Sequence, residues 1–111
     1  MLIYKTQLPL DTWDFKTVKL PFPDAEAARK AVLHLDIQYD LPCLWYQADV
    51  SDQEKEFLLI AIGTGHDWGS KLRREEYIGS LLLMDGTLVL HYFLVEAPEG
   101  EEKESDNEQI F

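Results

Sequence analysis

Hydrophobic residues along this chain alternate with polar ones over short runs, which is the spacing of β-strands rather than of helices. The clearest run spans residues 32–38. Its apolar positions are Leu33, Leu35 and Ile37, and its polar positions are His34, Asp36 and Gln38. A strand with this pattern places one set of side chains on the core and the other in water. We therefore expect His34 and Asp36 to face solvent together.

Six further runs have the composition and length of strands, and turn residues separate them. These runs cover residues 3–10, 15–20, 43–50, 57–62, 77–84 and 87–95. The first two lie on either side of residues 11–14 and predict an N-terminal hairpin. The last two flank Asp85 and Gly86, a pair that favours the positive φ angles of a two-residue hairpin turn. Residues 39–42 predict a turn that leads into the run that begins at Cys43.

One short helix is expected between the second and third runs. Asp24 is a suitable N-cap for residues 25–30, where three alanines favour helix. Glu26 complements the positive N-terminal end of such a helix, and Arg29 with Lys30 complements the negative C-terminal end. Isolated helices of two turns are marginal, so we expect this one to pack against a sheet.

Two of the predicted strands are apolar on both faces and need cover on both sides. Residues 57–62 form one of them, and we expect a central strand there. Along residues 87–95, one face carries Val89, His91, Phe93 and Val95, and the other carries Leu88, Leu90, Tyr92 and Leu94. The predicted fold class is α+β, mainly β: an antiparallel, curled or barrel-like sheet of about six to seven strands with one short helix. A homo-oligomer is the alternative source of cover.

Length and charge divide the chain into one domain and a tail. The chain has 111 residues and a formal net charge of −11. Residues 96–111 hold seven acidic residues against Lys103, a local charge of −6, and are too poor in apolar residues to offset the entropy of ordering. We therefore expect a single β-rich domain over residues 1–95 and a disordered acidic tail over residues 96–111.

The same composition limits the compartment and the ligands. Phosphate backbones are bound through cations, so the acidic balance opposes direct nucleic-acid binding. We expect no membrane segment, because no apolar run approaches the roughly 20 residues that a spanning helix needs. The N-terminus has no secretory pattern, so we expect a cytoplasmic protein. Cys43 is the single cysteine, which excludes an internal disulfide.

The segment between residues 63 and 74 carries most of the functional-looking side chains. Backbone amides at the end of a strand can face an anion, arginines supply charge, and a tryptophan can stack on a flat ring. The candidate ligand-binding residues are Gly63, Thr64, Gly65, His66, Trp68, Lys71, Arg73 and Arg74. The segment matches neither a P-loop nor a dinucleotide fingerprint. The structural alternative is a long strand connection with Gly65 at a special backbone angle and Trp68 packed over the sheet edge.

Catalytic signatures are incomplete. His66 and Asp67 suggest an acid/base pair or half of a metal site, and a hydrolase or metalloenzyme centred on them is one hypothesis. His34, His66 and His91 are enough in number for a zinc site, but nothing in their spacing requires one. We expect His91 to be a hydrogen-bonded core or edge residue.

The serines at 70 and 80 lack a nucleophile elbow, and Cys43 lies in an apolar strand. We therefore expect no enzyme, no catalytic residues, no metal site and no cofactor.

Five short segments together resemble a family of small uncharacterised proteins found in phage, prophage and bacterial genomes. They are Ile3-Tyr4-Lys5, Cys43-Leu44-Trp45, Gly63-Thr64-Gly65-His66, Tyr77-Ile78-Gly79 and Leu88-Val89-Leu90-His91. The resemblance spans most of residues 3–95, and the chain departs from it in residues 21–30 and in the tail. It implies no activity. Small phage proteins of this kind often bind host factors or sequester small signals, which is an analogy and identifies no site.

Two functional hypotheses follow from these observations. The first is a non-catalytic interaction protein that binds a host or phage protein through its apolar sheet and acidic surface. The alternative is a protein that binds or sequesters a small nucleotide-like anion with the segment from Gly63 to Arg74.

Overall fold

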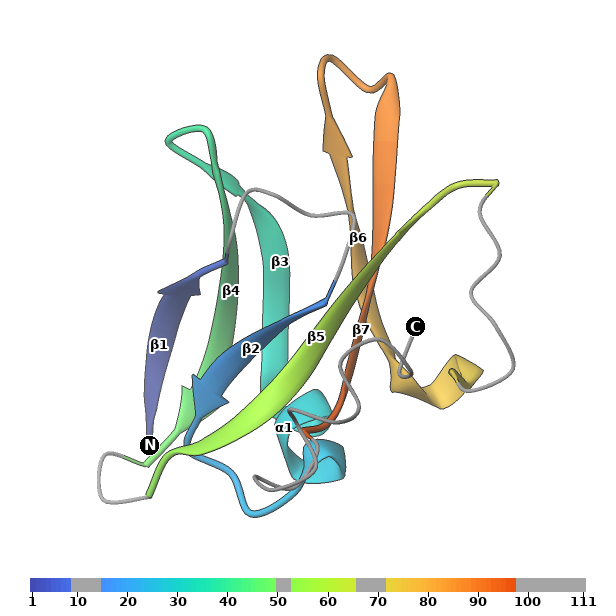
Figure 1. The fold of residues 1–111 in the computed structure, drawn as a ribbon. Helices are drawn as coiled ribbons and strands as arrows, with labels where there is room; N and C mark the ends of the chain where they lie inside the picture. The colour runs from blue at the N-terminus through green and yellow to red at the C-terminus, as the bar shows by residue number, and fades with distance from the viewer. Residues whose placement is uncertain (9–14, 50–52, 66–71, 98–111) are drawn as a thin grey trace.

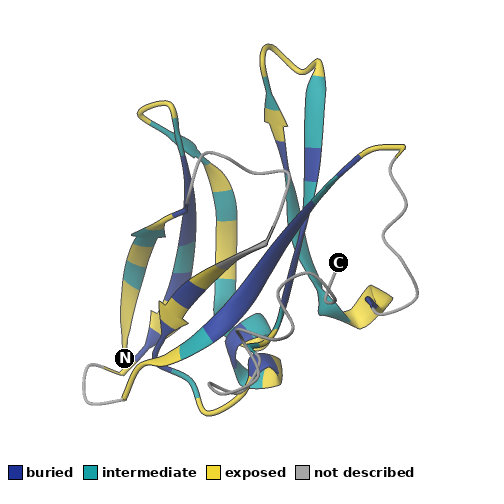
Figure 2. Ribbon diagram, viewed as in Figure 1, coloured by how far each residue is buried: buried dark blue, intermediate teal, exposed yellow. Residues whose placement is uncertain are grey.

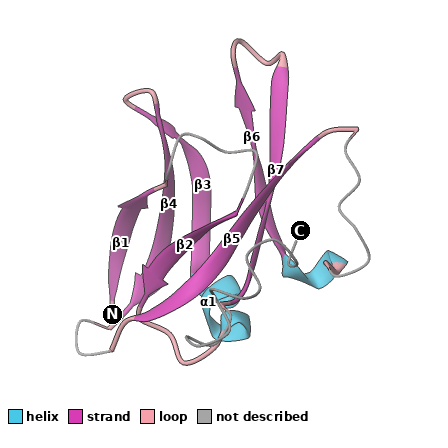
Figure 3. Ribbon diagram, viewed as in Figure 1, coloured by secondary structure: helices cyan, strands magenta, loops and turns pink. Residues whose placement is uncertain are grey.

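Two antiparallel β-sheets face each other in the computed structural model of this chain, which describes residues 1–8, 15–49, 53–65 and 72–97 (Figure 1). Sheet A has the strand order β1-β4-β3, and sheet B has the order β2-β5-β7-β6. The elements in chain order are β1 (Leu2–Gln7), β2 (Phe15–Leu20), α1 (Ala25–Ala31), β3 (Val32–Gln38), β4 (Leu41–Ala48), β5 (Lys55–Gly63), the short 3-10 helix η1 (Arg74–Glu76), β6 (Tyr77–Leu83) and β7 (Leu88–Glu96). The mainly β composition with one short α-helix confirms the predicted class (Figure 3).

The prediction of a barrel-like sheet is wrong, because the described strands form two sheets with no closed barrel. The inner face of each sheet covers that of the other. Leu44 and Tyr46 of β4 meet Leu59 of β5 and Leu90 of β7 in the same buried cluster. The two sheets approach most closely where the edge strands β3 and β6 contact each other. A second sheet therefore supplies the cover that was expected from a single curled or barrel-like sheet.

Strand β5 is the central strand that the sequence predicts. It lies between β2 and β7, and its residues from Phe57 to Ala61 are all buried (Figure 2). Leu59 faces sheet A, whereas Leu58 belongs to a second buried cluster on the opposite face of sheet B. That cluster also contains Phe93 of β7 and Leu72, which precedes η1. Both faces of sheet B thus carry buried side chains at β5 and β7, as the two-sided apolar pattern requires.

The predicted N-terminal hairpin is wrong. Strand β1 pairs with β4 in sheet A, and β2 pairs with β5 in sheet B. The amide of Leu8 donates to the carbonyl of Pro42 at 2.9 Å, so the chain continues along β4 after β1 ends. Two consecutive strands in different sheets do not form a hairpin, and residues 11–14, where the turn was expected, lie outside the described residues.

Helix α1 follows its predicted capping. The Asp24 side chain accepts a hydrogen bond from the amide of Ala27 at 2.8 Å, and Ala25 and Ala28 are buried in the core between the sheets. The chain passes from Ala31 directly into Val32, the first residue of β3. A seven-residue helix is marginal alone, so this buried alanine face holds it in place.

The alternation in β3 is broken by a β-bulge. The register shifts between Val32 and His34, and the intervening Leu33 is 49% exposed instead of facing the core. Val32 packs on the core in its place. Beyond the bulge the prediction holds, because Leu35 packs on the core and His34 faces solvent.

The two tight turns differ in detail from their predictions. The β3–β4 turn consists of Tyr39 and Asp40, and β4 begins earlier than expected, at Leu41. The β6–β7 hairpin is confirmed, but its connection has four residues instead of two, because Leu83 pairs with Leu88. Within that connection φ is positive at Met84, Asp85 and Gly86.

Candidate functional site

Four polar side chains form a continuous hydrogen-bonded chain on the face of sheet B that points away from sheet A. Thr64 follows the last residue of β5, and its Oγ1 lies 2.7 Å from Nε2 of His91 on β7. The other imidazole nitrogen of His91, Nδ1, lies 2.8 Å from Oγ of Ser80 on β6. Ser80 Oγ in turn lies 2.5 Å from the hydroxyl of Tyr77. We call these four residues the hydroxyl–imidazole chain.

A β-bulge in β6 makes this arrangement possible. Residues three apart on a regular strand point to opposite faces, so Tyr77 and Ser80 would not meet. The pairing of β6 with β7 shifts between Tyr77 and Gly79, which leaves Ile78 as the extra residue. Tyr77 therefore lies opposite Phe93, Ser80 lies opposite His91, and both β6 side chains reach the same face.

Gly79 is the residue that this bulge requires. Its φ is +154°, and a Cβ atom built on it would lie only 3.1 Å from Cδ2 of Leu35 on β3. A larger residue would push against the neighbouring sheet at the place where β3 and β6 contact each other. The absence of a side chain thus permits both the bulge and the close approach of the two sheets.

Arg73 and Arg74, which precede Tyr77 in the sequence, have different surroundings. Arg73 caps η1: its amide donates a hydrogen bond to the Glu76 carboxylate at 2.8 Å, and its Nε pairs with the Glu75 carboxylate at 3.0 Å. The guanidinium carbon of Arg74 lies 5.3 Å from the ring centre of Tyr77. Among the described residues, no carboxylate pairs with Arg74. The charge next to Tyr77 is therefore uncompensated by its described neighbours, whereas that of Arg73 is neutralised.

The predicted binding segment is only partly described. Gly63 is buried as the last residue of β5, and the turn that follows holds Thr64 and Gly65. Gly65 has a φ of +91° with open space around it, so its role is conformational. Of the remaining predicted residues, Arg73 and Arg74 are described above, and His66, Trp68 and Lys71 lie outside the described residues. The structure thus joins Thr64 and Arg74 to side chains that the sequence did not select.

Comparison with known proteins places these strands in a family. Residues 1–103 match a family described as a domain of unknown function, DUF7352. This chain belongs to that family. The match agrees with the resemblance to an uncharacterised family, and it includes both sheets and the hydroxyl–imidazole chain. No curated protein and no solved structure matches the chain.

The remaining histidine of the described DUF7352 residues is separate from this site. His34 lies on the outer face of sheet A, where its Nε2 is 3.3 Å from Asp36 and its ring is 5.4 Å from that of Trp45. His34 and Asp36 are both about 60% exposed, as the alternation predicts. His91 is hydrogen-bonded, which confirms the interpretation made from the sequence. The described residues contain no group of three His, Cys, Asp or Glu side chains arranged to hold a metal ion.

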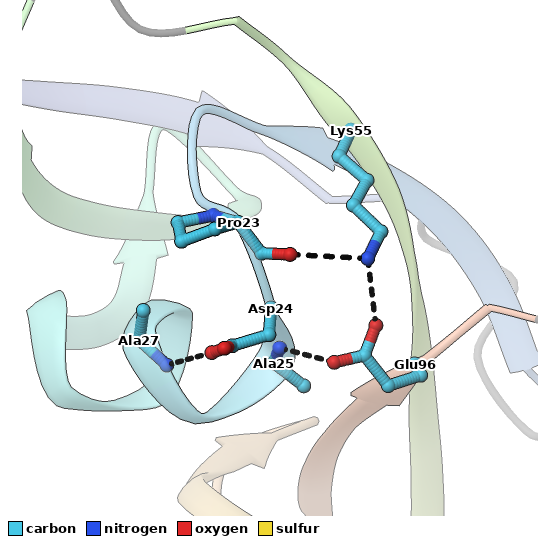
Figure 4. A network of polar contacts seen from close by, with 6 residues as sticks. All are labelled: Pro23, Asp24, Ala25, Ala27, Lys55 and Glu96. Carbon is cyan, nitrogen blue, oxygen red and sulfur yellow. Dashed lines mark hydrogen bonds and ion pairs between the residues drawn. The ribbon is translucent and has the colours of Figure 1, made fainter.

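A second polar network secures the end of β7 to helix α1 (Figure 4). Glu96 Oε2 accepts a hydrogen bond from the amide of Ala25 at 2.6 Å, and Glu96 Oε1 pairs with Lys55 at 3.1 Å. Lys55 also donates to the carbonyl of Pro23 at 3.1 Å. These contacts join β5, β7 and the N-terminus of α1, so their role is structural. Glu96, assigned to the tail from the sequence, is the last residue of β7.

The sequence-based reasoning missed Tyr77 and Ser80, and it dismissed Ser80 because no nucleophile elbow surrounds it. The single local signal was Gly79, since a glycine inside a strand pattern indicates a bulge or a close backbone approach. No helix in the described part of the chain is long and apolar enough to cross a membrane.

Proposed function

We propose that this chain is a non-catalytic interaction protein of phage type or bacterial origin that binds a host or phage protein. The observation that supports this proposal is the composition of its two tight turns. Tyr39 and Met84 are 86% and 72% exposed, and both have positive φ angles, 53° and 51°. An aspartate follows each of them, Asp40 and Asp85, and it too has positive φ.

Bulky side chains are unusual at these positions. A left-handed backbone costs an L-residue about 1–2 kcal/mol, and only glycine, asparagine and aspartate adopt it readily. Exposed Tyr39 and Met84 also gain little from burial, so folding does not account for them. Unfavourable local conformations of this kind cluster at functional sites, which supports a functional role for these two turns.

Both turns lie toward the same end of the molecule, at the top of Figures 1 and 2. Leu82, near the end of β6, adds a further apolar side chain that is 63% exposed. An apolar side chain beside a carboxylate at each turn suits a partner with an apolar recess bordered by lysines or arginines. The net charge of −11 favours the same kind of partner, and the association is then weakened by salt.

The test is affinity capture from a bacterial lysate with the full chain and with a variant carrying both Tyr39→Asn and Met84→Asn. Asparagine tolerates the left-handed backbone, so the variant should fold as well as the wild type. We expect it to lose the captured partner, and we expect Ile3→Asn to keep it. Ile3 is a matched control because it is 66% exposed but lies on β1, near the N-terminus (Figure 1). Equal capture by the double variant and the wild type would contradict the proposal.

The second candidate function is the binding of a small nucleotide-like anion by the segment from Gly63 to Arg74. The specific observation in its favour is Arg74, whose charge lies beside Tyr77 without a carboxylate partner among the described residues. Thermal-shift measurements with nucleotides test it, because a ligand of the folded state raises the melting temperature. We expect Arg74→Ala to remove that rise. A flat response to all nucleotides tested would rule out this function.

A further inference from the structure

The hydrogens of the hydroxyl–imidazole chain outnumber its internal bonds. Tyr77, Ser80 and Thr64 each carry one hydroxyl hydrogen, and a neutral His91 carries one N–H. The four groups are joined by three contacts, from Tyr77 to Ser80, from Ser80 to His91 and from His91 to Thr64. One hydrogen is therefore always left to donate outside the chain.

The position of that hydrogen depends on the direction of the bonds. If Tyr77 donates to Ser80 and Ser80 donates to Nδ1 of His91, then Nε2–H donates to Thr64, and the Thr64 hydroxyl is left over. If the bonds run the other way, Thr64 donates to Nε2, Nδ1–H donates to Ser80 and Ser80 donates to Tyr77, which leaves the Tyr77 hydroxyl. The two directions differ in which nitrogen of His91 carries the proton.

Charge distinguishes the two ends. At the Tyr77 end, the guanidinium carbon of Arg74 lies 5.3 Å from the centre of the Tyr77 ring. That guanidinium has no carboxylate partner among the described residues. A free phenol O–H next to an uncompensated guanidinium is a pair of donors. Such a pair complements a group that only accepts hydrogen bonds and carries negative charge, as phosphate does.

We infer that Arg74 and the Tyr77 hydroxyl bind a phosphate-class oxyanion, and that the anion fixes the direction of the hydroxyl–imidazole chain so that His91 carries its proton on Nδ1. This inference rests on the second proposed function, the binding of a small anion. It adds Tyr77, Ser80 and His91 to the site. It also couples the bound anion to Thr64, at the start of the segment that the sequence selected.

The experiment is a titration of the isotope-labelled full chain with inorganic phosphate and with AMP, followed by imidazole nitrogen NMR. Bound anion should move the His91 signals to the pattern of the Nδ1–H tautomer. Tyr77→Phe removes only the hydroxyl and keeps the ring that packs on Phe93. We expect Tyr77→Phe and Arg74→Gln each to weaken binding about tenfold or more. Lys30→Gln is the control, because Lys30 is an exposed cation that pairs with Glu26 on α1, outside this site, and it should change affinity less than about twofold.

The outcomes separate the inference from the function on which it rests. Binding that survives Tyr77→Phe unchanged, or that leaves the His91 tautomer unaltered, would overturn the inference while anion binding itself stands. No binding of phosphate or AMP by the wild type would remove both. Loss of binding in Tyr77→Phe, together with the Nδ1–H pattern in the wild type, would support both.

Discussion

The Glu96 carboxylate joins two parts of the chain that are 71 residues apart, and its removal should measurably weaken the fold. One carboxylate oxygen accepts the amide of Ala25, the first residue of α1, at 2.6 Å. The other pairs with Lys55 of β5 at 3.1 Å. We predict that Glu96→Ala lowers the free energy of unfolding by about 2 kcal/mol.

The magnitude follows from the two contacts. A hydrogen bond to a charged acceptor contributes about 1.5–3 kcal/mol when it is shielded, and the half-exposed Glu96 side chain places this one at the lower end. The ion pair adds less than about 1 kcal/mol, because the side chains of Lys55 and Glu96 are 48% and 50% exposed and water screens them. Ala25 itself is only 3% exposed, so the loss includes the cost of leaving its amide without a partner, which keeps the total at about 2 kcal/mol.

Two further variants separate the contributions. Glu96→Gln keeps an oxygen that can accept from Ala25 but loses the charge, so we expect a loss of about 1 kcal/mol. Glu26→Gln is the matched control. Glu26 also pairs with a lysine, Lys30, but both side chains are more than two-thirds exposed, and its loss should stay below about 0.5 kcal/mol.

Urea unfolding followed by tryptophan fluorescence measures these differences, provided that the slope of the transition is unchanged among the variants. A loss of 2 kcal/mol corresponds to a fall in melting temperature of about 10 °C for a domain of this size. If Glu96→Ala is no less stable than Glu26→Gln, the bond between β7 and α1 contributes nothing and the reasoning from its geometry fails.

Two other predictions concern stability. Gly79→Ala should lower the free energy of unfolding by about 1–3 kcal/mol, since the added Cβ would lie 3.1 Å from Leu35. Calorimetry should show a larger loss of stability than for Gly65→Ala, where the space is open. Equal losses would contradict the steric argument. Burial, with smaller contributions from Glu54 and Tyr4, raises the pKa of Tyr46 above 10.0. The unfolded chain then releases this proton at lower pH than the folded one, so stability should fall as pH rises above about 10, and less in Tyr46→Phe. Parallel unfolding curves for wild type and Tyr46→Phe between about pH 9 and pH 11 would refute the assignment.

Local patterns were sufficient to locate most of the elements. The predicted runs 15–20 and 32–38 coincide with β2 and β3, and Asp24 caps α1 as expected. These features depend on residues close in the chain, either through side-chain periodicity or through one capping bond. The two-sided apolar pattern of residues 57–62 also gave the central position of β5 correctly, because burial on both faces leaves no other place for such a strand.

Pairing between strands was not predictable in the same way. Periodicity states which face of a strand is buried but not which strand lies beside it. The N-terminal hairpin failed for this reason, since β1 and β2 carry the expected patterns but belong to different sheets. The barrel-like sheet failed for the same reason.

The candidate site could not be predicted from the sequence, because β6 departs from the two-residue side-chain alternation of a regular strand. With strict alternation, Tyr77 and Ser80 fall on opposite faces of β6, and only the extra residue Ile78 brings them together. Gly79 allows that extra residue because it can adopt a φ of +154°, and its lack of a Cβ also lets β3 pass close to it. The position that fits the two sheets together thus also assembles the hydroxyl–imidazole chain, and disturbance of Gly79 should affect both the packing of β3 on β6 and the contact between Tyr77 and Ser80.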